Sequence, residues 1–160
     1  MIYKHKLLNI QEIWFDENQK IEKVDKVIFN QVKNKVSENS VDFHTLVIDL
    51  NEPEEEIFKK IKKNNKYEIN RANNKDNLNT KIYVGNIEDK IIEKFVTSYN
   101  KFAIKRKLGC ISYDIYKSYS KEQSLIISNI SNEEGDVLSW HTYIHNNCKL
   151  RLILFNHKHN

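Results

Sequence analysis

One stretch of the chain combines residue types that can move protons. Residues 138–145 read Leu-Ser-Trp-His-Thr-Tyr-Ile-His. Because side chains alternate across a β-strand, Ser139, His141, Tyr143 and His145 would share one face. Imidazole exchanges a proton near neutral pH, so His141 is the natural general base. We interpret His141 and Tyr143 as candidate catalytic residues and Ser139 as a substrate-binding residue. The alternative is a hydrogen-bonded structural histidine on the exposed side of a half-buried sheet.

A second group of residues could hold an anion. On a helix, Lys60, Tyr67 and Arg71 fall within about 40° of one another, at the border of an apolar face. Arginine offers paired donors to a carboxylate or phosphate, and tyrosine offers a hydroxyl or a stacking face. The alternative is a solvated basic helix whose long side chains only cover their neighbours.

Other reactive side chains do not form a recognisable site. His141 and His145 would lie about 13 Å apart on a strand, too far to share an ion. His157 and His159 stand in a polar tail without a third ligand, so we expect no metal. Cys110 has only Lys and Tyr nearby, which favours a buried structural thiol. With three glycines in the chain, no glycine-rich phosphate loop is possible.

The hydrophobic pattern predicts the elements that position these residues. Residues 45–50 are short, β-branched and bounded by polar residues, which predicts a buried strand. Apolar positions at helical spacing predict one helix from Asn51 to Ala72, a second over 87–108 and a shorter one over 113–121. Further strands are expected over 5–14, 80–84, 124–130, 137–145 and 150–155, the last three as an antiparallel meander joined by turns at 132–135 and 146–147. Residues 20–36 fit either a helix or a strand.

Composition sets the class of protein. The 160 residues suit a single domain, 1–160, and the order of elements indicates an α+β fold. A net charge of +4 is a small difference between 26 basic and 22 acidic residues, so it gives little support to nucleic-acid binding. No apolar run approaches the roughly 20 residues of a membrane span, and the N-terminus lacks a secretory signal. We therefore expect a cytoplasmic protein.

Three stretches together resemble the FemAB-like branch of the GNAT-type acyltransferases, which includes peptidoglycan-bridge aminoacyltransferases and polysaccharide-linked acetyltransferases. The first is the strand pattern at 45–50 with the acidic helix start that follows it. The second is the run 66–72, Lys-Tyr-Glu-Ile-Asn-Arg-Ala, and the third is 138–144 leading into 148–155. The resemblance covers roughly residues 20 to 160 and lies in the order and spacing of all three.

The resemblance implies a GNAT-like mixed sheet and transfer of an acyl or aminoacyl group to an amine of a sugar or peptide. The donor would be acyl-coenzyme A or an aminoacyl carrier such as a charged tRNA. His141 and Tyr143 would line the central cleft, and Tyr67 and Arg71 would face the acceptor or the donor's phosphates. It also favours a strand over Val24 to Phe29, in place of a helix.

The chain departs from the family at the donor site. In GNAT folds the donor's pyrophosphate binds at the N-terminus of the helix that follows the fourth core strand. Residues 150–155 resemble that strand, and the sequence ends at Asn160 before such a helix. We expect the front part of a longer protein; the alternative is a short relative without the donor site.

Two other functions compete with acyl transfer. One is a non-catalytic binding module that keeps the cleft and lacks the donor site. The other is a basic nucleic-acid-binding domain that uses the lysines between Lys59 and Lys75.

Overall fold

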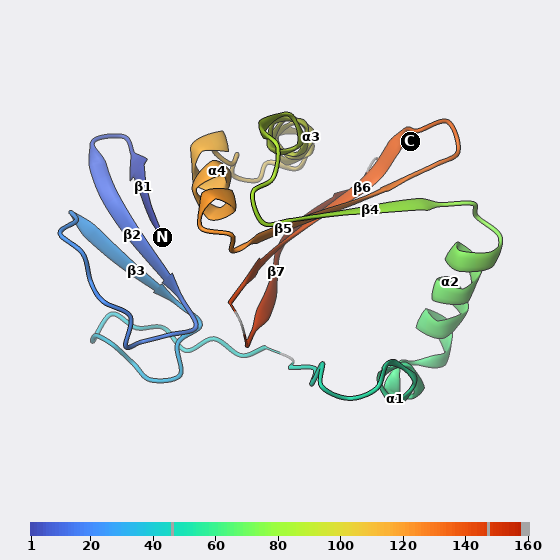
Figure 1. Ribbon diagram of the computed structural model, residues 1–160, viewed down its shortest axis with the longest axis horizontal. Helices are drawn as coiled ribbons and strands as arrows, with labels where there is room; N and C mark the ends of the chain where they lie inside the picture. The colour runs from blue at the N-terminus through green and yellow to red at the C-terminus, as the bar shows by residue number, and fades with distance from the viewer. Residues whose placement is uncertain (46, 147, 158–160) are drawn as a thin grey trace.

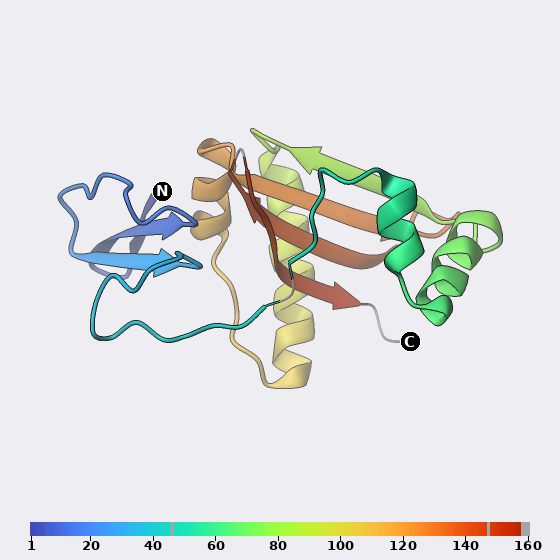
Figure 2. The same cartoon turned by 90° about the horizontal axis from the view of Figure 1, so that it is seen from below.

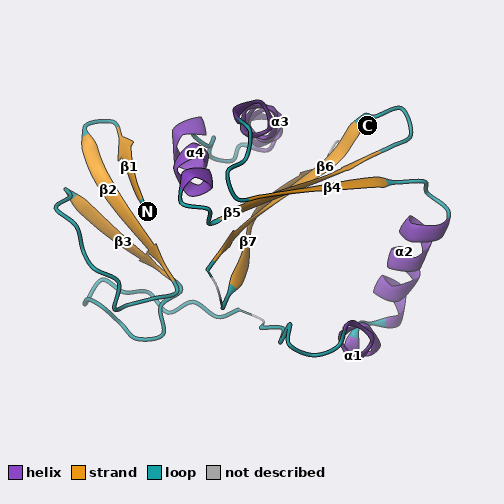
Figure 3. Cartoon of the chain, viewed as in Figure 1, coloured by secondary structure: helices purple, strands orange, loops and turns teal. Residues whose placement is uncertain are grey.

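The computed structural model describes residues 1–45, 47–146 and 148–157, which form an α+β fold with two separate sheets (Figures 1 and 3). The N-terminal sheet has the order β1-β2-β3 and the larger sheet the order β4-β5-β6-β7. Its strands are β1 (Ile2–His5), β2 (Leu8–Trp14), β3 (Lys26–Asn30), β4 (Asn79–Val84), β5 (Leu125–Ser131), β6 (Val137–His145) and β7 (Leu150–His157). The helices are α1 (Glu54–Lys60), α2 (Lys63–Asn74), α3 (Asp89–Arg106) and α4 (Tyr113–Lys121).

The larger sheet is antiparallel throughout and is covered by helices on one face. Burial alternates along β5, and its buried positions share a face with the buried Trp140, Thr142 and Ile144 of β6. Helices α3 and α4 pack on this face, whereas the other face is seen from below in Figure 2, with α3 behind the strands. The expected meander over the last three strands is confirmed.

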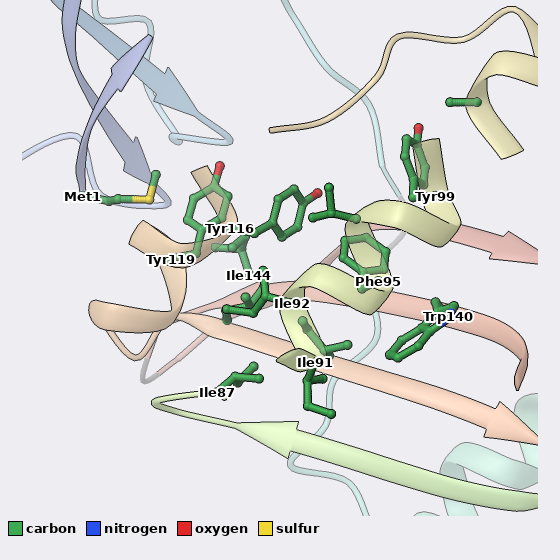
Figure 4. Packing of buried hydrophobic residues seen from close by; sticks show 14 of the residues in the cluster. Met1, Ile87, Ile91, Ile92, Phe95, Tyr99, Tyr116, Tyr119, Trp140 and Ile144 are labelled. Atoms are coloured by element: carbon green, nitrogen blue, oxygen red, sulfur yellow. The ribbon is translucent and has the colours of Figure 1, made fainter. Parts of the chain in front are cut away.

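The core gathers around one aromatic side chain of α3. Phe95 is fully buried, and its ring lies 5.2 Å from that of Tyr116 on α4 and 6.1 Å from that of Trp140 on β6 (Figure 4). The other buried residues of α3 share this face at helical spacing: Ile91, Ile92, Val96, Tyr99 and Ala103. The second predicted helix is therefore confirmed. One packed cluster thereby holds β6 against α3 and α4.

A carboxylate joins the N-terminal sheet to this core. Glu12 of β2 accepts a hydrogen bond from the Tyr119 hydroxyl of α4 at 2.8 Å and one from Asn30 Nδ2 of β3 at 2.5 Å. Tyr3 of β1 also hydrogen-bonds to this carboxylate. Glu12 therefore links three strands to a helix that is 107 residues away in sequence.

The N-terminal region contains strands, as the sequence predicts, but their bounds and pairing differ from the prediction. The strand expected over 5–14 is shorter and forms β2 from Leu8, because the chain turns at Lys6, whose φ is 55°; the residues before this turn form β1, which pairs with β2 as a hairpin. The strand favoured over Val24 to Phe29 is confirmed as β3, which pairs in parallel with β2.

The buried strand expected over 45–50 is wrong. Among the described residues of this segment none pairs in a sheet; Val47 is 87% exposed and Leu50 66%, and Leu46 lies outside the described residues. The β-branched content suits a strand, but no neighbouring edge pairs with it. Because this strand is missing, β3 is an edge strand of one sheet and β7 an edge strand of the other. The resemblance implies one mixed sheet, whereas the structure has two separate sheets.

The first long helix is broken in two. Ile61 and Lys62 have extended backbone, with ψ of 139° and 145°, so α1 ends at Lys60 and α2 starts at Lys63. Neither helix contains a buried residue, and asparagine, a weak helix former, recurs along α2. Most of the stability of a helix in a protein comes from packing its apolar face. Because neither segment packs such a face, no tertiary contact keeps α1 and α2 as one continuous helix.

Replacing Glu12 tests the link between the sheets. Glu12→Ala leaves the buried Tyr119 hydroxyl and Asn30 amide without their acceptor, and we expect it to lower the free energy of unfolding by about 1–3 kcal/mol. Urea unfolding followed by circular dichroism measures the change. Glu38→Ala, at an exposed carboxylate, is the control and should stay within about 0.5 kcal/mol of the parent. Equal midpoints for both variants would contradict a structural role for Glu12.

Candidate functional site

The expected polar row lies on the face of β6 that turns away from α3. The register places His141 opposite Ser128 of β5, and Tyr143 opposite Ile126 of β5 and Leu152 of β7. His141 and Tyr143 are both half-buried on this face. The alternation predicted from sequence is therefore confirmed, and the row lies on a surface that the core helices do not cover.

Ser139 is held by a hydrogen bond inside the protein. Its side chain is 5% exposed, and Oγ donates to the backbone oxygen of Asn156 on β7 at 3.0 Å. Asn156 Nδ2 in turn donates to Ser98 Oγ of α3 at 3.0 Å. Ser139 therefore fixes β6 to β7 and α3, and a substrate would have to displace this bond to use the hydroxyl.

A wide groove begins at Tyr143. It has a volume of about 1660 Å³ and is lined by β3, by residues within 31–45 and 47–51, and by Cys148, Lys149 and the first half of β7. Its apolar lining includes Val27, Phe43, Ile48 and Leu152. His141 is two residues further along the same face of β6, which is about 7 Å at the rise of a strand. The groove and the polar row are thus neighbours.

The predicted anion-binding stripe does not form. Lys60 is on α1, whereas Tyr67 and Arg71 are one turn apart on α2, beyond the break at Ile61. Lys60 is paired with Glu52, and Arg71 Nε lies 3.2 Å from Asp76 Oδ1, whose hydrogen bond raises the pKa of the guanidinium. Figures 1 and 2 show both helices apart from the centre of β6, with α2 near the β5–β6 turn, where Asn77 donates to Glu133.

Lysines of the same region make contacts within the chain. Lys59 is paired with Glu56, and Lys66 Nζ donates to the backbone oxygen of Lys59 at 2.8 Å while lying 5.7 Å from the ring of Phe58. These contacts hold α2 against α1. The Lys59–Glu56 pair is exposed to solvent, so it argues neither for nor against binding of a phosphate backbone.

Metal-ligating side chains and thiols do not gather into a site in the part of the chain that the structure describes. Within residues 1–45, 47–146 and 148–157, no group of three His, Cys, Asp or Glu side chains is placed to hold an ion; His159 lies outside these ranges. Cys110 and Cys148 are both exposed, so the expectation of a buried Cys110 is wrong. Among the helices described, none is both long and apolar enough to cross a membrane.

Sequence reasoning missed the cluster of tyrosines around Glu12. Burial and the neighbouring carboxylate raise the pKa of Tyr3 to about 12, and burial also raises the pKa of Tyr119 and of Tyr116. The available signal in the sequence was Glu12 within a strand that carries several large apolar residues, between Gln11 and Ile13, both of which are buried. Because the hydroxyls of Tyr3 and Tyr119 donate to Glu12, the cluster is a structural one.

No protein-family model matches this chain, and no curated protein sequence matches it.

The tyrosine cluster predicts loss of stability at alkaline pH. A phenol whose pKa is raised in the folded state contributes stability that is complete below its unfolded value, about 10. That contribution is then lost as the pH rises from there through about 12, the folded pKa of Tyr3. We expect the unfolding midpoint to be constant up to about pH 10 and to fall above it.

Phenolate absorbance, titrated in the folded and in the urea-unfolded chain, measures the shift. Tyr3→Phe should make the difference in phenol pKa between the folded and the unfolded chain smaller, because it removes one of the shifted hydroxyls. Identical titrations of folded and unfolded protein would contradict the prediction.

Proposed function

We propose that this chain takes part in transferring an acyl or aminoacyl group to an amine, with the acceptor bound on the open face of the larger sheet. The observation that supports this most directly is the row His141–Tyr143 on β6, half-buried and beside a wide groove. A general base needs such a place, near a cavity yet outside the packed core. The resemblance of three stretches to GNAT-type acyltransferases points to the same chemistry.

The reaction assigns a role to each residue of the row. The acceptor nitrogen attacks the carbonyl carbon of a thioester or ester donor, so a C–N bond forms and the bond to the leaving sulfur or oxygen breaks. His141 takes the proton that the amine loses, directly or through a water. Tyr143 donates a proton to the leaving group, and the same hydroxyl can be reprotonated from solvent. Ser139 supports the strand through Asn156, which makes it a positioning residue.

The residues on α2 have a secondary place in this proposal. Tyr67 is 61% exposed, and Arg71 can release Asp76 for a stronger anion because their ion pair is exposed to solvent. Lys60 is held by Glu52 on the other side of the helix break. We assign the acceptor's or donor's anionic groups to Tyr67 and Arg71, and no direct contact to Lys60.

A binding module without catalysis is the second candidate. The glycines of the chain, Gly85, Gly109 and Gly135, are far apart, so they form no glycine-rich loops of the kind that hold phosphates. A pyrophosphate-containing donor is ordinarily bound by backbone amides of such elements. This observation favours a protein that binds the amine ligand and receives its donor on another chain, or that transfers nothing.

Substitution of His141 tests the catalytic role. His141→Ala should lower turnover by about two to four orders of magnitude if it is the general base. The assay is release of free coenzyme A or deacylated carrier in the presence of amino sugars and short peptides. His145→Ala is the matched control, because His145 shares the strand and the face and lies four residues beyond His141. Full activity in a folded His141→Ala variant would refute general-base catalysis here.

Thermal unfolding with coenzyme A and acetyl-coenzyme A separates the two candidates. A ligand at about 100 times its dissociation constant stabilises by about 2.7 kcal/mol, which is a shift of a few degrees for a chain of this size. We expect such a shift if the chain binds the thioester donor itself. A cooperative transition that does not move with either ligand, nor with a charged tRNA, would favour the binding module.

A further inference from the structure

Large apolar side chains lie exposed along the groove next to Tyr143. Val47 is 87% exposed and Ile48 66%, both on the segment 31–51, and Leu152 of β7 is 40% exposed. Apolar surface gathered in a hollow is typical of a binding site. The volume of about 1660 Å³ also exceeds the roughly 300–1,000 Å³ of an ordinary small-molecule pocket. A long apolar ligand would fit this space.

The charges around the groove are unequal. Lys35 lies 3.4 Å from Asp42, so these two lining residues largely offset each other. The other charged lining residues are mostly positive: Lys26, Lys33, Lys149 and Arg151. The negative charge among them comes from Asp49. Lys26 and Lys33 are exposed on and after β3, at the rim. The rim therefore favours an anion, while the floor favours hydrocarbon.

We propose that this groove binds a long-chain fatty acyl group with an anionic head. The aliphatic chain lies along Phe43, Val47, Ile48 and the edge of β7, and the positively charged lining side chains, Lys26 and Lys33 among them, attract the head group. The occupant is a single amphiphile and not a membrane surface, because the apolar residues line a hollow between two sheets.

The proposal deepens the function proposed above and rests on it for its catalytic meaning. Tyr143 lines the groove, and His141 is about 7 Å further along the same face. An acyl chain held here would lie next to the row on β6. Binding itself needs no turnover, so the test measures binding alone.

Isothermal calorimetry with dodecanoate, kept below its micellar concentration, is the experiment. We expect saturable binding at one site. Val47→Asp/Ile48→Asp should weaken it by about tenfold or more, because two apolar contacts are lost and negative charge enters the groove. Leu7→Asp/Ile104→Asp is the matched control: those side chains are 87% and 69% exposed and lie outside the groove. It should bind within about twofold of the parent.

Two further probes test the head group. Lys26→Gln/Lys33→Gln should weaken dodecanoate binding several-fold and leave dodecanol, a neutral chain of equal length, unchanged. Dodecyltrimethylammonium, of opposite charge, should bind less tightly than dodecanoate. High salt should weaken the dodecanoate complex, because the rim charges are exposed.

Several results would overturn the proposal. These are no binding of dodecanoate, an equal loss in both aspartate double variants, tighter binding of the cationic amphiphile, or binding only to phosphatidylglycerol vesicles and not to the monomeric probe. His141→Ala keeps the two proposals distinguishable. If it still binds dodecanoate, and the parent transfers nothing, the groove stands and the transferase function fails.

Discussion

The arrangement of the molecule depends on one partly buried carboxylate. Glu12 accepts hydrogen bonds from Tyr119 and Asn30, and with them it joins the N-terminal sheet to α4. A carboxylate removed from water destabilises a fold unless donors satisfy it. Here the donors come from β1, β3 and α4, so the carboxylate is satisfied only when all of these elements are in place. The orientation of the small sheet is thus specified by a polar contact, and apolar residues such as Phe15 add packing to it.

This junction decides what the larger sheet presents to solvent. Helix α4 contacts both β1 and β5, so Glu12 holds the N-terminal sheet on the side of the helices and leaves the opposite face of β6 open. Phe95 and its aromatic neighbours hold β6 from behind. His141 and Tyr143 therefore stand on a strand that is held by the core, and Tyr143 lines the groove, which suits precise positioning of a ligand.

The sequence predicted well wherever burial has a simple period. Helices α3 and α4 and strands β5 and β6 each bury one face against the same core, so spacing alone locates them. The prediction of a strand over 45–50 was wrong. β-Branched residues indicate that a segment can form a strand, but they do not indicate whether a neighbouring strand is there to pair with it. The sequence-based prediction also failed at Ile61, because a helix with no buried face is not held together by its periodicity. The Glu12 contact joins residues 107 apart, which no local pattern reveals.

The same misread segment explains why a groove exists next to the predicted site. Had residues 45–50 paired with β7 or β3, their apolar side chains would be part of a continuous sheet, and Tyr143 would face a packed surface. Instead Phe43 lies 5.2 Å from the guanidinium of Arg151, which also donates to the Thr45 hydroxyl at 2.6 Å. These side-chain contacts hold the segment near β7 without a backbone ladder. The apolar residues that follow, Val47, Ile48 and Leu50, therefore line the groove. Tyr143 of the row on β6 lines the same groove.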